Sequence, residues 1–214
     1  MIVLALDAAS PSPAVALLSR GEIHEERLPS DRRASEALLP AIRRVLAAAG
    51  ATLDATARIA VCAGPGSFTG LRVGLATAWG LARATGAELE AVSTLEALAE
   101  SARPSSGSRV VAVLDAGRGD LVLERFDVSG ARARSLGPPR LVAADDVRAR
   151  AGEDPLVALP ETLVVPPTPT VTATPAAALA AAVARAPGAV ASRAAAPAGI
   201  YARPSAAEEK HGAA

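Results

Sequence analysis

The chain has 214 residues, no formal net charge, and hydrophobic residues at half of its positions. With charged residues at 21%, this composition predicts a globular protein whose core fills one large domain or two small ones. The chain contains only one Trp, one Tyr and two Phe. Autonomous tight RNA binding is therefore not expected, because neither a basic field nor a base-stacking platform is available.

Metal and disulfide chemistry have few candidate residues. The single cysteine, Cys62, excludes an intrachain disulfide and suits a reducing compartment. His24 and His211 are far apart, so a His/Cys metal site is not expected, although carboxylates could still hold Mg²⁺ beside a phosphate. The N-terminus lacks a basic leader, and no apolar run reaches 18 residues. We expect a cytoplasmic protein that does not contact a membrane.

The first part of the chain predicts a strand-rich unit. Residues 2–6 form an apolar run that ends at Asp7, and residues 14–18 and 22–28 are typical of two further strands. Asp7 and Ser10 border the first turn, where a carboxylate could coordinate a phosphate-bound metal. The alternative is that Asp7 caps the turn by bonding its own backbone.

A glycine-rich turn at residues 63–74 links a strand at 58–62 to a helix at about 69–85. Gly64, Gly66 and Ser67 favour either an anion cradle at a helix N-terminus or a tight connection without a ligand. Neither the Walker pattern nor the dinucleotide-binding pattern fits, because Lys210 is the only lysine and the glycine spacing is one residue too long.

Two helices carry apolar stripes. A helix at 35–49 has apolar residues at helical spacing, and Pro40 makes its start uncertain. In the helix at 69–85, small residues recur every four positions, which favours close packing either inside the chain or against a partner. A third helix is expected to start at 94–96, with Thr94 as its cap.

The second half repeats the opening pattern. After a linker at 101–108, an apolar strand at 110–114 ends in Asp115, and another strand follows at 121–128. A short helix at 145–151, a short strand at 156–159 and a helix at 176–185 complete the pattern. Two units that each open with a strand, an Asp, a turn and a strand suggest the actin/Hsp70/sugar-kinase architecture.

Specific motifs resemble the TsaB (YeaZ) family, the dimerisation subunit of the bacterial tRNA threonylcarbamoyladenosine machinery. The most specific is GPGSFTGLRVG at 64–74. Supporting matches are IVLALDAAS at 2–10, SEALLPAI at 35–42, VSTLEAL at 92–98, LDAGRGD at 114–120 and YARP at 201–204. The resemblance implies an α/β, two-lobed actin/Hsp70-like (ASKHA, RNase H-like) fold with a reduced second lobe. We expect residues 1–103 to form the first lobe and 104–214 the second, with a tail from about 187 returning to the first.

The resemblance also implies a function. The chain would be a non-catalytic partner of the catalytic subunit TsaD, acting with the ATPase TsaE to modify the adenosine beside the anticodon of ANN-decoding tRNAs. Contact with tRNA would be indirect, and ATP or ADP would bind at the complex interface but not to the isolated chain. Whether the chain alone is a homodimer or a monomer stays open.

The family pairs subunits through its first two helices, which implies an interface on those helices here. The strand-end aspartates and the glycine turn are separately expected to form a vestigial phosphate site. The expected interface residues are Leu38, Leu39, Ile42, Gly70, Leu71, Gly74, Leu75 and Ala78. The expected vestigial phosphate-binding residues are Asp7, Ser10, Gly64, Gly66, Ser67 and Asp115. No catalytic residue and no metal ligand is expected. The alternative function is a stand-alone ATP-dependent phosphoryl or carbamoyl transferase of the ASKHA class, built on Asp7, Asp115 and the glycine turn.

Overall fold

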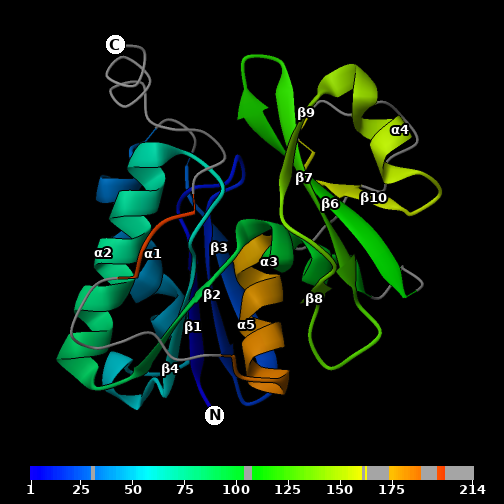
Figure 1. Ribbon diagram of the computed structural model, residues 1–214. Helices are drawn as coiled ribbons and strands as arrows, with labels where there is room; N and C mark the ends of the chain where they lie inside the picture. Colours follow the sequence, from blue (N-terminus) through cyan, green and yellow to red (C-terminus); the bar gives the residue numbers. More distant parts are fainter. Residues whose placement is uncertain (30–31, 104–107, 161, 163–173, 189–196, 201–214) are drawn as a thin grey trace.

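Two β-sheets organise the protein, and each belongs to one of two lobes (Figure 1). The computed structural model describes residues 1–29, 32–103, 108–160, 162, 174–188 and 197–200. The YARP motif at 201–204 lies outside these residues. No helix within them has the length and apolar character that a bilayer crossing requires.

The first sheet has the strand order β3-β2-β1-β4-β5. Its first three strands form an antiparallel meander, and β4 and β5 run parallel to β1. The strand bounds are β1 (Val3–Asp7), β2 (Ala14–Ser19), β3 (Glu22–Arg27), β4 (Arg58–Cys62) and β5 (Glu88–Val92). Every residue of β1 is buried, as its continuous apolar run predicts for a strand covered on both faces.

Helices cover both faces of this sheet (Figure 1). On one face, α1 (Ala34–Ala48) and α2 (Phe68–Thr85) pack their apolar stripes against the strands. Pro40 lies inside α1 on its exposed side, where solvent reaches the backbone that the proline leaves unbonded. A 3-10 turn, η1 (Leu53–Ala55), precedes β4.

The other face is covered by α5 (Pro175–Arg185), and α3 (Thr94–Ser101) packs beside α5. Sequence reasoning assigned the cap of α3 to Thr94, and this was wrong. The Ser93 hydroxyl accepts a hydrogen bond from the Leu95 N–H at 3.2 Å, while Thr94 is a buried helical residue.

The second lobe is built on the order β10-β6-β7-β8, with β9 also paired to β7. Its elements are β6 (Arg109–Gly117), β7 (Asp120–Asp127), β8 (Arg134–Ser135), β9 (Arg140–Ala143), η3 (Ala144–Asp146), α4 (Val147–Ala151) and β10 (Leu156–Ala158). Its helices are short, so the predicted two-lobed fold with a reduced second lobe is confirmed.

The α5 helix belongs to the first lobe in space, although the predicted division placed its residues in the second. Its buried side chains, among them Leu179 and Val183, join the core formed by β1, β2 and β4. Thr174 caps the helix through a 3.1 Å bond from the Ala177 N–H, and Pro175 occupies its first turn. The return to the first lobe therefore begins at the start of α5, before the predicted tail.

A buried ionic cluster joins the lobes. Arg132, from the loop between β7 and β8, bonds Glu90 of β5 and lies 2.6 Å from Glu96 of α3. Glu100 of α3 accepts bonds from Arg103, from Arg185 of α5 and from the Ala133 N–H. The side chains of Glu90 and Glu100 are only 3% and 1% exposed, so this cluster places full charges where solvent hardly reaches.

Candidate functional site

The glycine turn at the start of α2 is packed against other backbone. A side chain at Gly66 would lie 2.6 Å from the Ala9 carbonyl oxygen, and side chains at Gly64 and Gly70 would meet the carbonyl oxygens of Ile200 and Ala8. Such approaches leave no room for a β-carbon. The glycines therefore serve the close packing of this turn on the β1–β2 hairpin and on the returning C-terminal segment.

The polar groups of this turn bond within the chain. The Ser67 N–H donates to the Ala9 carbonyl at 2.8 Å, and the Ser67 hydroxyl accepts from the Gly70 N–H at 3.3 Å. The Ile200 N–H donates to the Ala63 carbonyl at 2.6 Å. Ser67 is thus the N-cap of α2; the sequence alone left both Ser67 and Thr69 as candidates. The Ser67 and Gly70 N–H groups, two donors that a phosphate cradle would present, are therefore engaged within the chain, which favours a tight connection.

Asp7 acts as a turn cap. Its Oδ1 accepts hydrogen bonds from the Ala9 and Ser10 N–H groups, both at 3.1 Å, and the side chain is completely buried. Burial raises the pKa of this carboxyl, and the hydrogen bonds from Ser10 and Ala9 offset part of that rise. Its Oδ2 has no hydrogen-bond partner within the described ranges.

Asp115, the equivalent residue of the second lobe, is exposed in β6. Its Oδ1 accepts a 2.6 Å bond from the Gly117 N–H, so it too shapes its own turn. Among the residues that the structure describes, no group of three or more His, Cys, Asp or Glu side chains is arranged to hold a metal ion. The two aspartates thus have structural roles in their hairpins.

The predicted interface residues require a correction, because the structure places most of them inside the chain. Leu38 and Ile42 of α1, and Leu71 and Leu75 of α2, are buried against the first sheet. Gly70, Gly74 and Ala78 are buried on the same side of α2. Only Leu39 is exposed, at 47%. The most apolar stripe of each helix covers the sheet, so the surface that a partner can reach lies on the opposite side.

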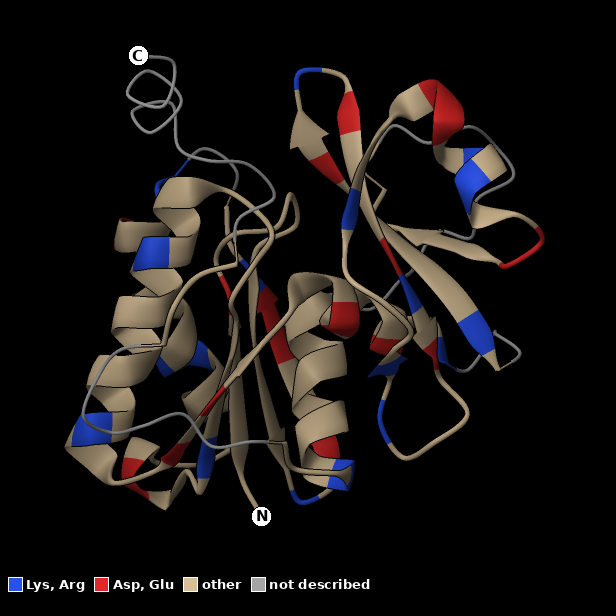
Figure 2. Ribbon diagram, in the orientation of Figure 1, with Lys and Arg blue, Asp and Glu red and all other residues tan. Residues whose placement is uncertain are grey.

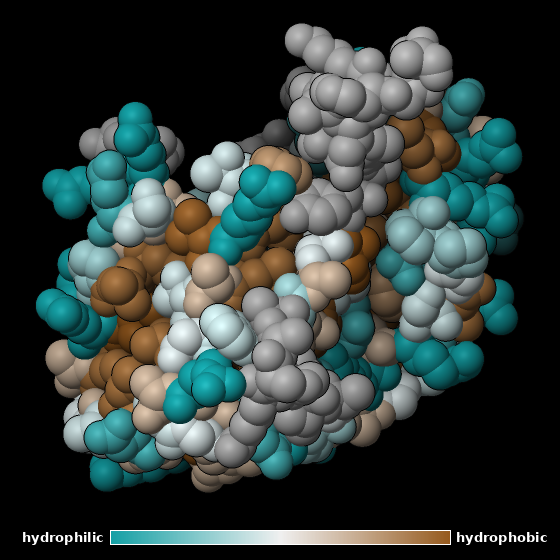
Figure 3. All heavy atoms as spheres, turned by 60° about the vertical axis from the view of Figure 1, so that its left-hand side comes forward, coloured by the Kyte–Doolittle hydropathy of each residue, from teal (hydrophilic) through white to brown (hydrophobic). Residues whose placement is uncertain are grey.

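We call that opposite side the outer face, and define it by solvent-accessible residues of the two helices. They include Glu36, Leu39, Pro40, Arg43 and Ala47 of α1, and Phe68, Arg72, Val73, Ala76, Thr77, Gly80 and Arg83 of α2. The ribbon of α2 carries basic segments and no acidic one (Figure 2). The space-filling view shows a broad hydrophobic area between hydrophilic residues on this side of the molecule (Figure 3).

Gly80 marks the centre of the exposed side of α2. A β-carbon at this position would meet no atom within 4 Å. A glycine inside a helix costs about 0.5–1 kcal/mol relative to alanine, and no contact among the described residues requires a glycine here. Arg72 lies beside this surface with its guanidinium 3.8 Å from the Phe68 ring centroid. The outer face thus combines small and apolar centres with arginines.

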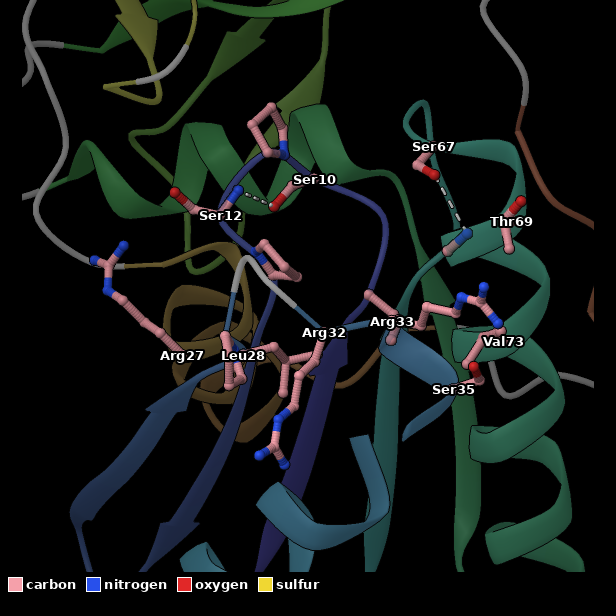
Figure 4. A pocket seen from close by; sticks show the side chains of 16 residues that line it. Ser10, Ser12, Arg27, Leu28, Arg32, Arg33, Ser35, Ser67, Thr69 and Val73 are labelled. Carbon is pink, nitrogen blue, oxygen red and sulfur yellow. Dashed lines mark hydrogen bonds between the residues drawn. The ribbon is translucent and has the colours of Figure 1, made fainter. Parts of the chain in front are cut away.

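A basic pocket of about 520 Å³ borders the outer face (Figure 4). Its walls are the β1–β2 hairpin, the segment before α1, and the first turns of α1 and α2. The lining residues are Ala8, Ser10, Pro11, Ser12, Pro13, Arg27, Leu28, Pro29, Arg32, Arg33, Ala34, Ser35, Ser67, Thr69, Gly70 and Val73. Among the described residues of this lining, three are arginines and none carries a carboxylate. Val73 belongs to both the pocket and the outer face.

The sequence predicted Ser10 and Ser67, which line this pocket, as phosphate-binding residues, but it did not predict that Arg27, Arg32 and Arg33 line it too. The available signal was the Arg32-Arg33 pair directly before a helix, where positive charge opposes the helix dipole and is not expected for stability alone. Folding brings this pair to the N-terminal ends of both helices.

The family assignment follows from comparison with known proteins. Residues 28–158 match the family model described as TsaD, tRNA N6-adenosine threonylcarbamoyltransferase. This chain belongs to the TsaD family, in its TsaB (YeaZ) group. The TsaB of Escherichia coli K12 is 34% identical over 122 residues, which are 56% of this chain and 53% of that protein. The TsaB of Haemophilus influenzae is 38% identical over 117 residues, which are 54% of this chain and 50% of that protein. The chain thus matches about half the length of these relatives.

A solved structure supports the same placement in the TsaB (YeaZ) group. YeaZ from Pseudomonas aeruginosa superposes with a TM-score of 0.76 at 28% identity, and the match covers 94% of this chain and 99% of that one. The family predicted from the glycine block and its supporting motifs is therefore confirmed, and the structural match extends over both lobes.

Proposed function

We propose that this chain is a non-catalytic accessory subunit that pairs with TsaD in the biosynthesis of tRNA threonylcarbamoyladenosine. The observation that carries the proposal is the outer face of α1 and α2, an exposed apolar surface with a mid-helix glycine, Gly80, whose β-carbon position is open among the described residues. TsaE is the proposed third component, and tRNA contacts the chain only through the assembled complex.

The packed glycine turn supports a non-catalytic role. Its Ser67 N–H bonds the Ala9 carbonyl of the hairpin, and its glycines approach the backbone of Ala8, Ala9 and Ile200. The alternative, a stand-alone phosphoryl or carbamoyl transferase, would need ATP to bind the isolated chain. Titration calorimetry with Mg-ATP separates the two: tight binding by the chain alone would support the transferase and count against an accessory subunit.

A matched pair of glycine variants tests the pairing face. Gly80 and Gly137 both have open space at the β-carbon position and ordinary backbone angles, but Gly137 lies in the second lobe. Gly80→Leu should leave the fold intact, because leucine is a better helix former than glycine. We expect Gly80→Leu to abolish co-purification with TsaD and restoration of tRNA modification in a depleted extract, while Gly137→Leu retains both. Equal behaviour of the two variants would reject the proposed face.

We also propose that ATP or ADP, bound at the complex interface, places its phosphates in the basic pocket. Arg27, Arg32 and Arg33 line this pocket, which is large enough for a nucleotide phosphate chain, and guanidinium groups bind phosphate well. Calorimetry of the assembled TsaD complex with ADP tests this. An Arg32→Gln/Arg33→Gln variant should lose one ADP site per complex relative to the wild-type chain, and an unchanged stoichiometry would reject the pocket.

A further inference from the structure

The second lobe contains a small hollow at the edge of its sheet, which we call the second-lobe pocket. Its volume is about 120 Å³, and its lining includes Leu123, Arg125, Leu136, Pro138, Arg140 and Arg150. Sites for drug-sized ligands have volumes of roughly 300–1,000 Å³. The second-lobe pocket is therefore large enough only for a chemical group of a few heavy atoms.

The pocket exists because the edge strand beside β7 is interrupted. β9 pairs with residues 120–123 of β7, and β8 pairs with residues 126 and 127. Residues 124 and 125 of β7 therefore lie opposite the break. Pro138 and Pro139 lie within it, and a proline lacks the N–H group that a continuous ladder of hydrogen bonds would need. The break leaves space at the sheet edge.

Three arginines from three elements line this space. Arg140 of β9 lies opposite Leu123 of β7, and Arg125 is two residues further along β7, so both arginines belong to the same face of the sheet. Arg150 comes from α4, which packs on that face through Val147 and carries basic residues in Figure 2. Folding thus gathers the three arginines at one hollow.

The one carboxylate residue of the lining, Glu124, belongs to the other face of the sheet. Side chains alternate along a strand, and its neighbours Val122 and Phe126 pack in the core that also contains Leu98 of α3. Burial raises the pKa of Glu124, and a hydrogen bond with Ser135 offsets part of the rise. Glu124 therefore does not neutralise the arginines across the sheet.

Arg125 is held in place by its own chain. Its Nε donates to an Asp154 carboxylate oxygen at 2.5 Å, and its Nη2 donates to the carbonyl oxygens of Arg150 and Ala151 at 3.3 and 3.0 Å. These bonds use the N–H groups of Nε and Nη2, so those of Nη1 are the ones available to a ligand. Asp154 compensates the charge of Arg125.

Arg140 and Arg150 differ from Arg125 in this respect. Both are exposed, and neither forms an ion pair with a residue that the structure describes. Like charges that line one hollow repel each other, and an anion between them converts that repulsion into attraction. The second-lobe pocket thus presents two uncompensated guanidinium groups beside a third that is already oriented.

We propose that the second-lobe pocket binds a phosphate group, with Arg140 and Arg150 as its main ligands and Arg125 as a fixed donor. Guanidinium groups match phosphate oxygens in bidentate geometry, and the volume admits one phosphate. The phosphate is inorganic phosphate or the head of a small phosphate monoester whose remaining atoms project into solvent. The site goes beyond the proposed function, since none of these arginines lies on the outer face or in the basic pocket.

Titration calorimetry of the full chain with sodium phosphate at constant ionic strength tests the site. The starting chain carries Arg32→Gln/Arg33→Gln, so that the basic pocket of the first lobe does not contribute. We expect one phosphate site. Adding Arg140→Gln/Arg150→Gln should weaken binding at least 10-fold, and Arg140→Lys/Arg150→Lys should weaken it less because the charge is kept but the bidentate geometry is lost.

A matched control removes the same charge elsewhere in the lobe. Arg109→Gln/Arg134→Gln, at exposed positions outside the pocket, should bind phosphate as the starting chain does. In a ¹⁵N NMR spectrum, phosphate should shift the Arg125 Nε–H signal of the starting chain but not that of the Arg140→Gln/Arg150→Gln chain. This signal also shows whether the glutamine variant keeps the folded environment of Arg125.

The two sources of phosphate are separated by a titration with glycerol 3-phosphate. Either probe supports the site if its binding is lost in the glutamine variant and kept in the control, and the tighter probe identifies the source. The proposal is overturned if neither probe binds the starting chain, if the glutamine variant binds as well, or if the control loses binding equally. TsaD is absent from these titrations, so a failure of the pairing experiments leaves this test unaffected.

Discussion

Replacing Arg132 should show most clearly how much the ionic cluster between the lobes contributes to the stability of the fold. Its side chain is 17% exposed and bonds Glu90, which is 3% exposed, and Glu96, which is 22% exposed. Arg132→Met keeps a long apolar stem and removes the charge. Glu90 would then retain the Gly188 N–H at 3.0 Å and Arg58 at 3.8 Å, while Glu96 would lose its ion pair with Arg132.

The expected cost follows from this geometry. Removing one partner of a buried ion pair typically costs about 3–5 kcal/mol, since the other charge stays buried without compensation. The partial exposure of Glu96 and the remaining contacts of Glu90 reduce this, so we expect about 2–4 kcal/mol. For a chain of this size each kcal/mol lowers the Tm by about 2–4 °C, so the Tm should fall by roughly 5–15 °C.

Urea unfolding followed by circular dichroism measures the free energy, and a double-mutant cycle with Glu90→Gln isolates the pair. Glu90→Gln should cost less in the Arg132→Met background than in the wild type. Arg134→Met, which breaks the exposed pair with Asp127, is the matched control and should leave the Tm nearly unchanged. An Arg132→Met variant as stable as the Arg134→Met control would refute the buried-cluster reasoning.

Three further predictions concern single positions. Gly70→Ala should destabilise the fold by roughly 1–3 kcal/mol in urea unfolding, because the added β-carbon meets the Ala8 carbonyl. Gly80→Ala should stabilise the fold by about 0.5–1 kcal/mol, because its β-carbon position is open. The opposite order of the two stabilities would contradict the packing described. Thr174→Ala should cost about 1 kcal/mol through loss of the α5 cap, and no change in Tm would show that the cap bond is unimportant. Since burial raises the folded-state pKa of Asp7, its ionisation destabilises the folded chain as pH rises from near 3.8 through that pKa. The stability of Asp7→Asn relative to the wild type should therefore increase as the pH rises above about 4, and a relative loss would contradict the sign.

Local patterns predicted the elements well, because periodicity and caps are set by neighbouring residues. The apolar run ending at Asp7 and its repeat at Asp115 pointed to two lobes, and the observed α1 and α2 begin within one residue of the predicted starts. Sequence periodicity identifies the apolar stripe of a helix but not what covers that stripe. Leu71 and Ala78 were therefore assigned to a partner, although the chain's own sheet covers them.

Contacts between residues far apart in the sequence could not be predicted either, because local patterns do not show which segments meet in the fold. Glu90 lies in a strand and Arg132 in a loop 42 residues away, and nothing local indicates that they meet between the lobes. The basic pocket depends in the same way on the position of Arg32 and Arg33 beside the N-terminus of α2. Such sites arise from tertiary packing. The family motifs, in contrast, lie mainly at turns and helix caps, which local sequence can predict.

The most direct test of the central proposal is the mass of the complex formed with TsaD, measured by sedimentation velocity at 50 mM NaCl. We predict a one-to-one complex for the wild-type chain and for Gly137→Leu, and separate components for Gly80→Leu. A Gly80→Leu chain that still forms the complex at wild-type affinity would contradict pairing through the outer face of α1 and α2.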